Sequence, residues 1–277
     1  KQTMKQVLSL LLFAMISSAV YAGFPIGRGK YLIVPSYNLY QAKGYWKDDG
    51  TYVDYANGGR FTSHYFGLYG GFGLTENLDF IGNVNYTIQR KMETGLTEQN
   101  ASLGDASFGL QYLLNSFDYY KFLTVSGSLI VPLYQNNPAK QPYTGFQQVG
   151  GEVKMSFSGT NRERLRNTYY DINAGVKQYF SPEGPTQLFF DALLGVPVDD
   201  MNKFTFAMSG IKSNSTQSIF NYGNLAAIRS FSYFRLTAGY GRKIDQNYQL
   251  FINIFTDVSG KNTGKGAGGS ISIVAKL

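Results

Sequence analysis

The chain has no cysteine, a single histidine and a single tryptophan among its 277 residues. Without cysteine it forms no disulfides and carries no lipid-modified N-terminal cysteine. One histidine does not supply a typical metal site, so we expect no metal and no cofactor. The one long apolar run, residues 7–19, is shorter than the roughly 20 residues of a transmembrane helix.

That run has the pattern of a secretory signal peptide. Lys1 and Lys5 precede it, and Val20-Tyr21-Ala22 follows it with small residues at the positions of a cleavage site. We therefore expect a signal peptide over 1–22 and a single mature domain over 23–277; an uncleaved anchor is the alternative. Export without cysteine favours a Gram-negative envelope.

Most of the remaining sequence alternates between apolar and polar residues. In the stretch LGDASFGLQYLL, residues 103–114, one parity is apolar or aromatic, and the other is small or polar. Such alternation is typical of a β-strand with one face in oil and one in water. Twelve segments show it: 31–42, 61–74, 78–90, 102–114, 122–134, 151–159, 169–180, 187–198, 204–209, 231–242, 248–256 and 268–277.

The connections between these segments alternate in length, as in bacterial outer-membrane barrels with short periplasmic turns and longer extracellular loops. The expected long loops are 43–60, 91–101, 135–150, 210–230 and 259–267. Residues 181–185 break the pattern, because they are a short hairpin where an outer loop is expected. The register holds only if 151–159 is a real strand.

A β-sandwich or lipocalin-like barrel also alternates, with its oil inside. Three features indicate instead that the apolar faces contact membrane lipid. The apolar faces carry almost no charge, the opposite faces make a poor packed core, and Tyr and Phe gather near strand ends. The sequence thus predicts an all-β fold: a transmembrane antiparallel up-and-down barrel of about twelve strands in a Gram-negative outer membrane.

The polar parity of this barrel faces the lumen. We expect it to line a solute path with these residues: Asp79, Asn83, Asn85, Asp105, Gln111, Asp171, Lys177, Asp191, Arg235 and Asn253. A hydrogen-bonded plug filling a narrow barrel is the alternative. The 181–185 hairpin predicts that Lys177 pairs with Asp191 on the next strand.

Two stretches resemble a bacterial family of outer-membrane transporters named for the meta-cleavage pathway of phenol degradation. They are GRGKYLIVPSYNLYQAKGYWKDDG, residues 27–50, and the L-G-D-x-x-x-G-L-x-Y pattern beginning at Leu103. The resemblance implies passage of hydrophobic or aromatic compounds and no catalytic residues. Fatty-acid-transporter barrels are distantly similar and have an N-terminal hatch. Here residues 23–30 are too short for such a plug, so any gate is expected in loops such as 210–230, in particular 216–229.

We therefore expect an outer-membrane channel or transporter for small, hydrophobic or aromatic solutes. The second candidate is a non-conducting structural or assembly barrel. The third is a lipid-modifying enzyme that would use His64, but we expect His64 to be an ordinary residue at the rim of the barrel. Among partners we expect outer-membrane lipids and lipopolysaccharide, besides the solute. The excess of Lys and Arg over Asp and Glu, 25 against 18, is dispersed along the chain, so nucleic acid is not expected. The oligomeric state stays open.

Overall fold

The structure is a computed structural model that describes residues 23–137, 139–161, 167–216 and 228–277. The expected signal peptide and most of the 216–229 segment lie outside these residues. Among the described residues, no helix is long and apolar enough to cross a membrane.

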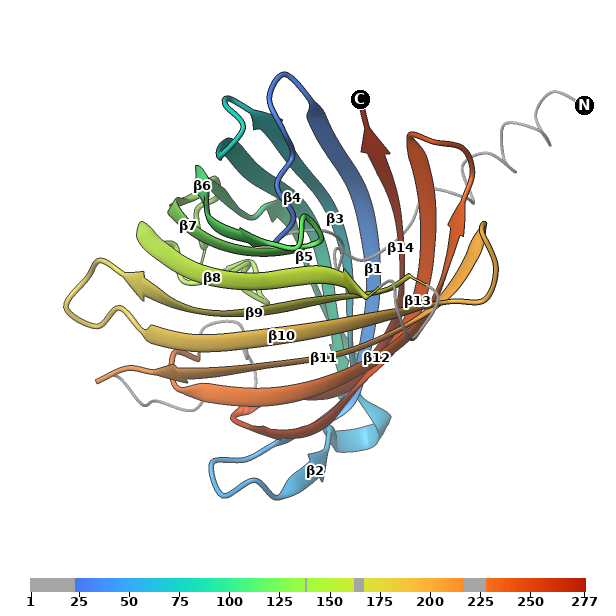
Figure 1. The fold of residues 1–277 in the computed structure, drawn as a ribbon. Helices are drawn as coiled ribbons and strands as arrows, with labels where there is room; N and C mark the ends of the chain where they lie inside the picture. Colours follow the sequence, from blue (N-terminus) through green and yellow to red (C-terminus); the bar gives the residue numbers. More distant parts are fainter. Residues whose placement is uncertain (1–22, 138, 162–166, 217–227) are drawn as a thin grey trace, which may run out of the picture.

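Twelve long strands form a closed antiparallel barrel (Figure 1). Neighbours in the chain pair with each other, and β1 closes the barrel by pairing with both β3 and β14. The expected up-and-down barrel is confirmed. Its wall strands are β1 (Tyr31–Trp46), β3 (Arg60–Gly73), β4 (Leu78–Glu93), β6 (Asp105–Phe117), β7 (Lys121–Pro132), β8 (Gly150–Asn161), β9 (Thr168–Tyr179), β10 (Thr186–Pro197), β11 (Asn202–Asn214), β12 (Phe231–Lys243), β13 (Tyr248–Lys261) and β14 (Thr263–Lys276).

Three short elements extend the wall at one end. β2 (Tyr52–Asp54) pairs with the end of β1 and is followed by the single turn η1 (Ala56–Gly58), and β5 (Leu96–Leu103) pairs with the end of β4. The expected loops 91–101 and 259–267 are wrong, because both are strand hairpins with turns of one or two residues. Beyond the membrane both faces of a hairpin meet water, so the alternation that reveals a strand fades there.

The two ends of the barrel differ in their connections. Figure 1 places the C-terminus at the opposite end from β2. Short turns join the strands at the C-terminal end, at 74–77, 118–120, 198–201 and 244–247, whereas the β2 end carries the long connections 47–59, 133–149 and 215–230. The end with the C-terminus is therefore the periplasmic end. The 181–185 hairpin lies at the outer end, and β8 is the strand on which its register depends.

The two faces of the wall differ as the alternation predicts. On β6, Leu110 is 47% exposed, whereas its neighbour Gln111 is 2% exposed. Large apolar side chains cover the outside, and polar side chains such as Ser156, Ser158 and Ser272 are buried inside. Closure lets the wall strands satisfy one another's backbone hydrogen bonds, which is required within lipid.

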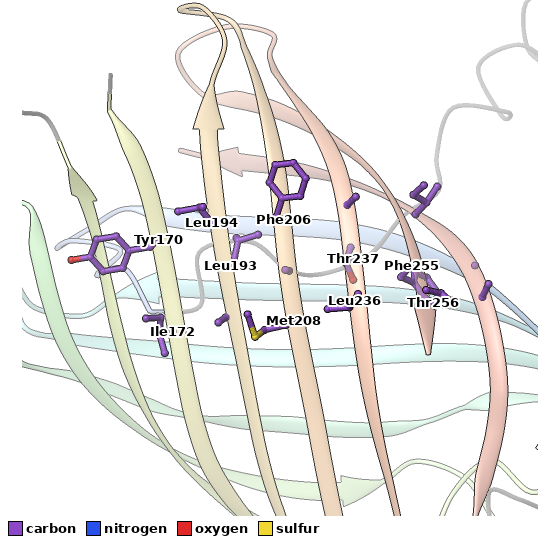
Figure 2. A pocket seen from close by; sticks show the side chains of 16 residues that line it. Tyr170, Ile172, Leu193, Leu194, Phe206, Met208, Leu236, Thr237, Phe255 and Thr256 are labelled. Carbon is purple, nitrogen blue, oxygen red and sulfur yellow. The ribbon is translucent and has the colours of Figure 1, made fainter. Parts of the chain in front are cut away.

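The outer surface also has a broad apolar depression of about 840 Å³ over β9–β14 (Figure 2). Small outward residues, Ala192, Ala238 and Ala267, lie among larger ones such as Phe206 and Met208. Phe206 and Met208 are 54% and 46% exposed. Most of its lining residues have the outward parity, so this hollow faces the lipid.

Candidate solute path in the barrel lumen

All ten candidate residues lie on the inward parity of their strands. Each is buried or half-buried: Asp79, Asn83, Asn85, Asp105, Gln111, Asp171, Lys177, Asp191, Arg235 and Asn253. Strand pairing brings some of them into contact, and others bind partners that the alternation alone does not indicate. Among the described residues, no group of three His, Cys, Asp or Glu side chains could hold a metal ion.

A cavity of about 400 Å³ lies in the middle of the lumen. One wall is charged and comes from β8, β9 and β10, where Glu152, Lys177 and Asp191 line the space. The facing wall comes from β3 and contributes Tyr65 and Tyr69. The cavity thus offers charged groups on one side and aromatic rings on the other.

The charged wall is held together by a salt bridge and a hydrogen bond. Lys177 Nζ lies 3.0 Å from Glu152 Oε2, and their strands place the two residues directly opposite. The Lys177 ammonium also lies 5.1 Å from the centroid of the Phe189 ring. Asn173 Nδ2 donates to Asp191 Oδ2 at 2.6 Å. Both groups of the pair remain partly accessible, with side-chain exposures of 32% for Lys177 and 19% for Glu152.

The expected Lys177–Asp191 pair is wrong. β9 and β10 pair so that Lys177 is opposite Gln187 and Asn173 is opposite Asp191. The tight 181–185 turn therefore sets a register two residues away from the one expected. Four residues separate Asp191 from the position opposite Lys177, about 13 Å along a strand, so Lys177 binds Glu152 on its other side.

The alternation does not identify Glu152, because the segment 151–159 that becomes β8 is one of two short segments with weak alternation. Its signal is the parity that it shares with Lys154, Ser156 and Ser158, of which the last two are buried. A polar residue at every second position marks the inward face even where the apolar face is short.

Nearer the outer end of β12, an arginine is enclosed by aromatic rings. Arg235 Nε donates to Asp257 Oδ1 at 2.7 Å. The guanidinium carbon lies 4.3 Å from the Phe255 ring centroid and 5.6 Å from that of Tyr40. The two rings are stacked, with an interplanar angle of 7°. Ring faces attract a cation and here replace part of its water.

One side of the periplasmic half of the lumen, formed by β1, β13 and β14, is apolar, which the polar parity did not predict. Leu32, Val34, Phe251 and Val274 form a buried cluster, against which Ile26 and Tyr69 pack. All four are at most 3% exposed. Short inward runs of apolar residues at strand ends have the same parity as the polar residues, so alternation identifies the face but not its chemistry.

The segment that precedes β1 enters this half of the lumen. The Ile26 N–H donates to Asp79 Oδ2 at 3.0 Å, and Gln111 Nε2 donates to the Phe24 carbonyl at 3.4 Å. Thr124 Oγ1 donates to the Gly23 carbonyl at 3.3 Å. Residues 23–26 therefore lie inside the barrel, because inward polar side chains bind their backbone; that residues 23–30 are too short to plug the lumen stays a prediction.

His64 lies on the outward parity of β3, together with Phe66 and Leu68, which are 38% and 47% exposed. Its Nδ1 lies 2.5 Å from the Tyr37 hydroxyl oxygen, on the neighbouring strand β1. Ser63 has the opposite parity and faces the lumen, so the two residues do not form a nucleophile–base pair.

The wall of twelve strands, its apolar outside and its polar inside define the chain as a Gram-negative outer-membrane β-barrel. No protein-family profile matches the sequence, and no curated protein does. The resemblance to the meta-pathway transporters therefore stays a prediction.

Solved structures share the fold at low sequence identity. The COG4313 outer membrane channel from Pseudomonas putida F1 superposes with a TM-score of 0.71 at 13% identity, over 95% of this chain and 100% of that one. The translocator domain of the autotransporter NalP from Neisseria meningitidis gives 0.53 at 10% identity, over 100% and 97%. The NanC porin gives 0.52 at 6% identity, over 87% and 98%. At such identities these similarities show the fold alone.

Proposed function

We propose that this barrel is a channel or transporter that passes small, hydrophobic or aromatic solutes across the outer membrane. The observation that carries the proposal is the cavity of about 400 Å³ in the middle of the lumen. A barrel that serves only as a structural element has no need for such a space. The two similar barrels named as a channel and a porin point the same way.

The chemistry of the lumen supports an amphipathic or aromatic solute. Tyr65 and Tyr69 present rings to the cavity, and Tyr40 and Phe255 stack nearer the outer end. Aromatic faces bind other rings by stacking and edge contacts. The Glu152–Lys177 pair on the opposite wall is neutral as a unit, so it does not impose a strong charge preference on the solute.

A closed structural barrel is the second candidate, and one observation favours it. Residues 23–26 and the Leu32–Phe251 cluster occupy the periplasmic half of the lumen. In a channel these residues are a constriction that solutes pass or displace. In a structural barrel they are a permanent seal.

The experiment is uptake into liposomes that hold the purified protein, over a panel of aromatic and aliphatic compounds. The informative variant is Ala207→Phe, because Ala207 lines the cavity from β11. Its control is Ala238→Phe, which adds the same ring to the lipid-facing depression on β12.

We expect wild type and the control to admit aromatic compounds and the Ala207 variant to slow them at least severalfold. Uptake by wild type that equals the rate of empty liposomes would contradict the channel. Equal rates for wild type and the Ala207 variant would mean that the cavity is not on the path.

A further inference from the structure

The outward face of β1, β3 and β4 changes its chemistry along the strands. At the periplasmic end, Tyr31, Phe72 and Phe80 are opposite one another across the three strands. The Tyr31 and Phe72 rings lie 4.7 Å apart between centroids. This aromatic row has the position of the girdle that marks the inner membrane interface of outer-membrane barrels.

Ten residues further along the same strands, the outward row is polar. Gln41 is opposite Thr62, and Thr62 is opposite Arg90. Lys43 and Arg60 follow directly on β1 and β3, beyond the last pair of those strands, Ala42 and Phe61. The three cationic residues are exposed, whereas their inward neighbours Ala42 and Lys91 are buried.

The distance between the two rows matches the thickness of the membrane. Ten residues span about 33 Å along a strand. At the usual tilt of roughly 40°, that distance gives a height of about 25 Å, the height of the apolar band. Lys43, Arg60 and Arg90 therefore lie at the level of the headgroups of the outer leaflet.

These cations have no acidic partner among the described residues. The six salt bridges of the described chain involve none of the three. Asp54, on neighbouring β2, accepts a hydrogen bond from the Tyr52 hydroxyl at 2.5 Å instead. Like charges on adjacent strands repel each other, so a bound anion would stabilise this arrangement.

The cluster occupies three adjacent strands, and the exposed Lys261 of β13 differs from it by pairing with Asp48. Lys265 of β14 extends the cluster, lying 4.5 Å from the centroid of the Tyr52 ring. On the opposite side, Lys212 of β11 is an exposed cation next to Leu188 and Ser232, without an ion pair among the described residues. An even ring of lysines would serve general attraction to the membrane. Cations on three adjacent strands instead favour the binding of one lipid headgroup.

We propose that Lys43, Arg60 and Arg90 form a binding site for the phosphorylated headgroup of lipopolysaccharide lipid A. Arginine binds phosphate through two parallel hydrogen bonds, and lysine adds a compact charge. Adjacent strands are about 4.8 Å apart and alternate residues about 7 Å apart, so these long side chains on three neighbouring strands can reach a single phosphate. The apolar face below, with Phe66 and Leu68 exposed, contacts the acyl chains. The site does not depend on whether the barrel conducts.

The test is native mass spectrometry of the folded, detergent-solubilised protein with bis-phosphorylated lipid A. The variant is the triple substitution Lys43→Gln, Arg60→Gln and Arg90→Gln, and the control is Lys212→Gln. Each cation near an anionic surface contributes about fivefold in affinity. We expect the triple variant to bind roughly a hundredfold more weakly and the control to bind like wild type.

A second measurement uses wild type alone and so does not depend on how well the variant folds. Dephosphorylated lipid A should bind wild type as weakly as bis-phosphorylated lipid A binds the triple variant. Equal affinity of wild type for the two lipids would overturn the proposal. So would phosphatidylglycerol binding as tightly as lipid A, because that result would indicate general attraction to anionic lipid.

Discussion

The Arg235 guanidinium is held between a carboxylate and an aromatic ring: its Nε lies 2.7 Å from Asp257 Oδ1, and its central carbon lies 4.3 Å from the Phe255 ring centroid. The two side chains differ in exposure, which is 27% for Arg235 and 3% for Asp257. They come from adjacent strands, β12 and β13, at a point where the register shifts by one residue. The ion pair therefore links β12 and β13 at the position where their register is irregular.

The first prediction follows from this difference in exposure. Arg235→Gln leaves a buried carboxylate without its cation, which costs about 3 kcal/mol in the free energy of unfolding. Asp257→Asn leaves an arginine that still reaches water and the rings, and we expect it to cost less. Urea unfolding in detergent measures both. A larger loss for Asp257→Asn would contradict the role given to the rings and to the exposure of Arg235.

The second prediction concerns the charged wall of the cavity. Because Lys177 and Glu152 are partly exposed, their pair contributes about 1 kcal/mol or less to stability. Lys177→Gln should therefore leave heat resistance nearly unchanged and shift ion selectivity toward cations, whereas Asp191→Asn should shift it toward anions. The reversal potential of the channel in a salt gradient reports both shifts.

The outward Lys212→Gln is the control for selectivity, since its side chain lies outside the lumen. A lumen that works as a packed plug gives a different result: Asp191→Asn lowers the melting temperature, and neither parent nor variant carries a current. That combination would reject the channel.

Alternation predicted the wall because lipid outside and polar groups inside repeat every two residues over the whole membrane-spanning height. It did not predict which side chains meet. Lys177 pairs with Glu152 rather than Asp191 because a shift of two residues in a tight turn preserves every facing while changing every partner. The sequence thus predicts whether a side chain lies on the inner or the outer face of the wall. Which residues are opposite one another depends on the geometry of the turn.

Asp257 and Tyr40 show two further limits. Asp257 lies one residue beyond the expected strand 248–256, whereas β13 continues to Lys261. Tyr40 has the inward parity of β1, but a tyrosine there is equally consistent with a wet face or a packed one. The binding of residues 23–26 inside the barrel depends on Asp79, Gln111 and Thr124, which are distant in the sequence.

The third prediction tests the facing of the wall. Cysteines at Leu110 and Phe190, which are 47% and 42% exposed, should react with lipid-soluble thiol reagents only. Cysteines at the inward Gln111 and Asp191 should react with water-soluble reagents, and Gln111 more slowly, because the segment before β1 covers it. The native chain has no cysteine, so background labelling is absent. Labelling in the reverse pattern would mean a soluble fold with its oil inside.

The last prediction concerns the segment that enters the lumen from the periplasmic end. Asp79 is 3% exposed, and its Oδ2 accepts hydrogen bonds from the Ile26 N–H at 3.0 Å and from Gln111 Nε2 at 3.4 Å. Asp79→Ala removes both hydrogen bonds and leaves a buried backbone N–H unpaired, which costs about 1–3 kcal/mol. That loss should favour release of residues 23–26 and raise single-channel conductance in planar bilayers. Asp79→Asn is the matched control, because its carbonyl oxygen still accepts from Ile26 and should keep conductance near that of wild type. Equal conductance for Asp79→Ala and wild type would show that this segment does not limit the path, and the apolar cluster around Phe251 would then be the constriction.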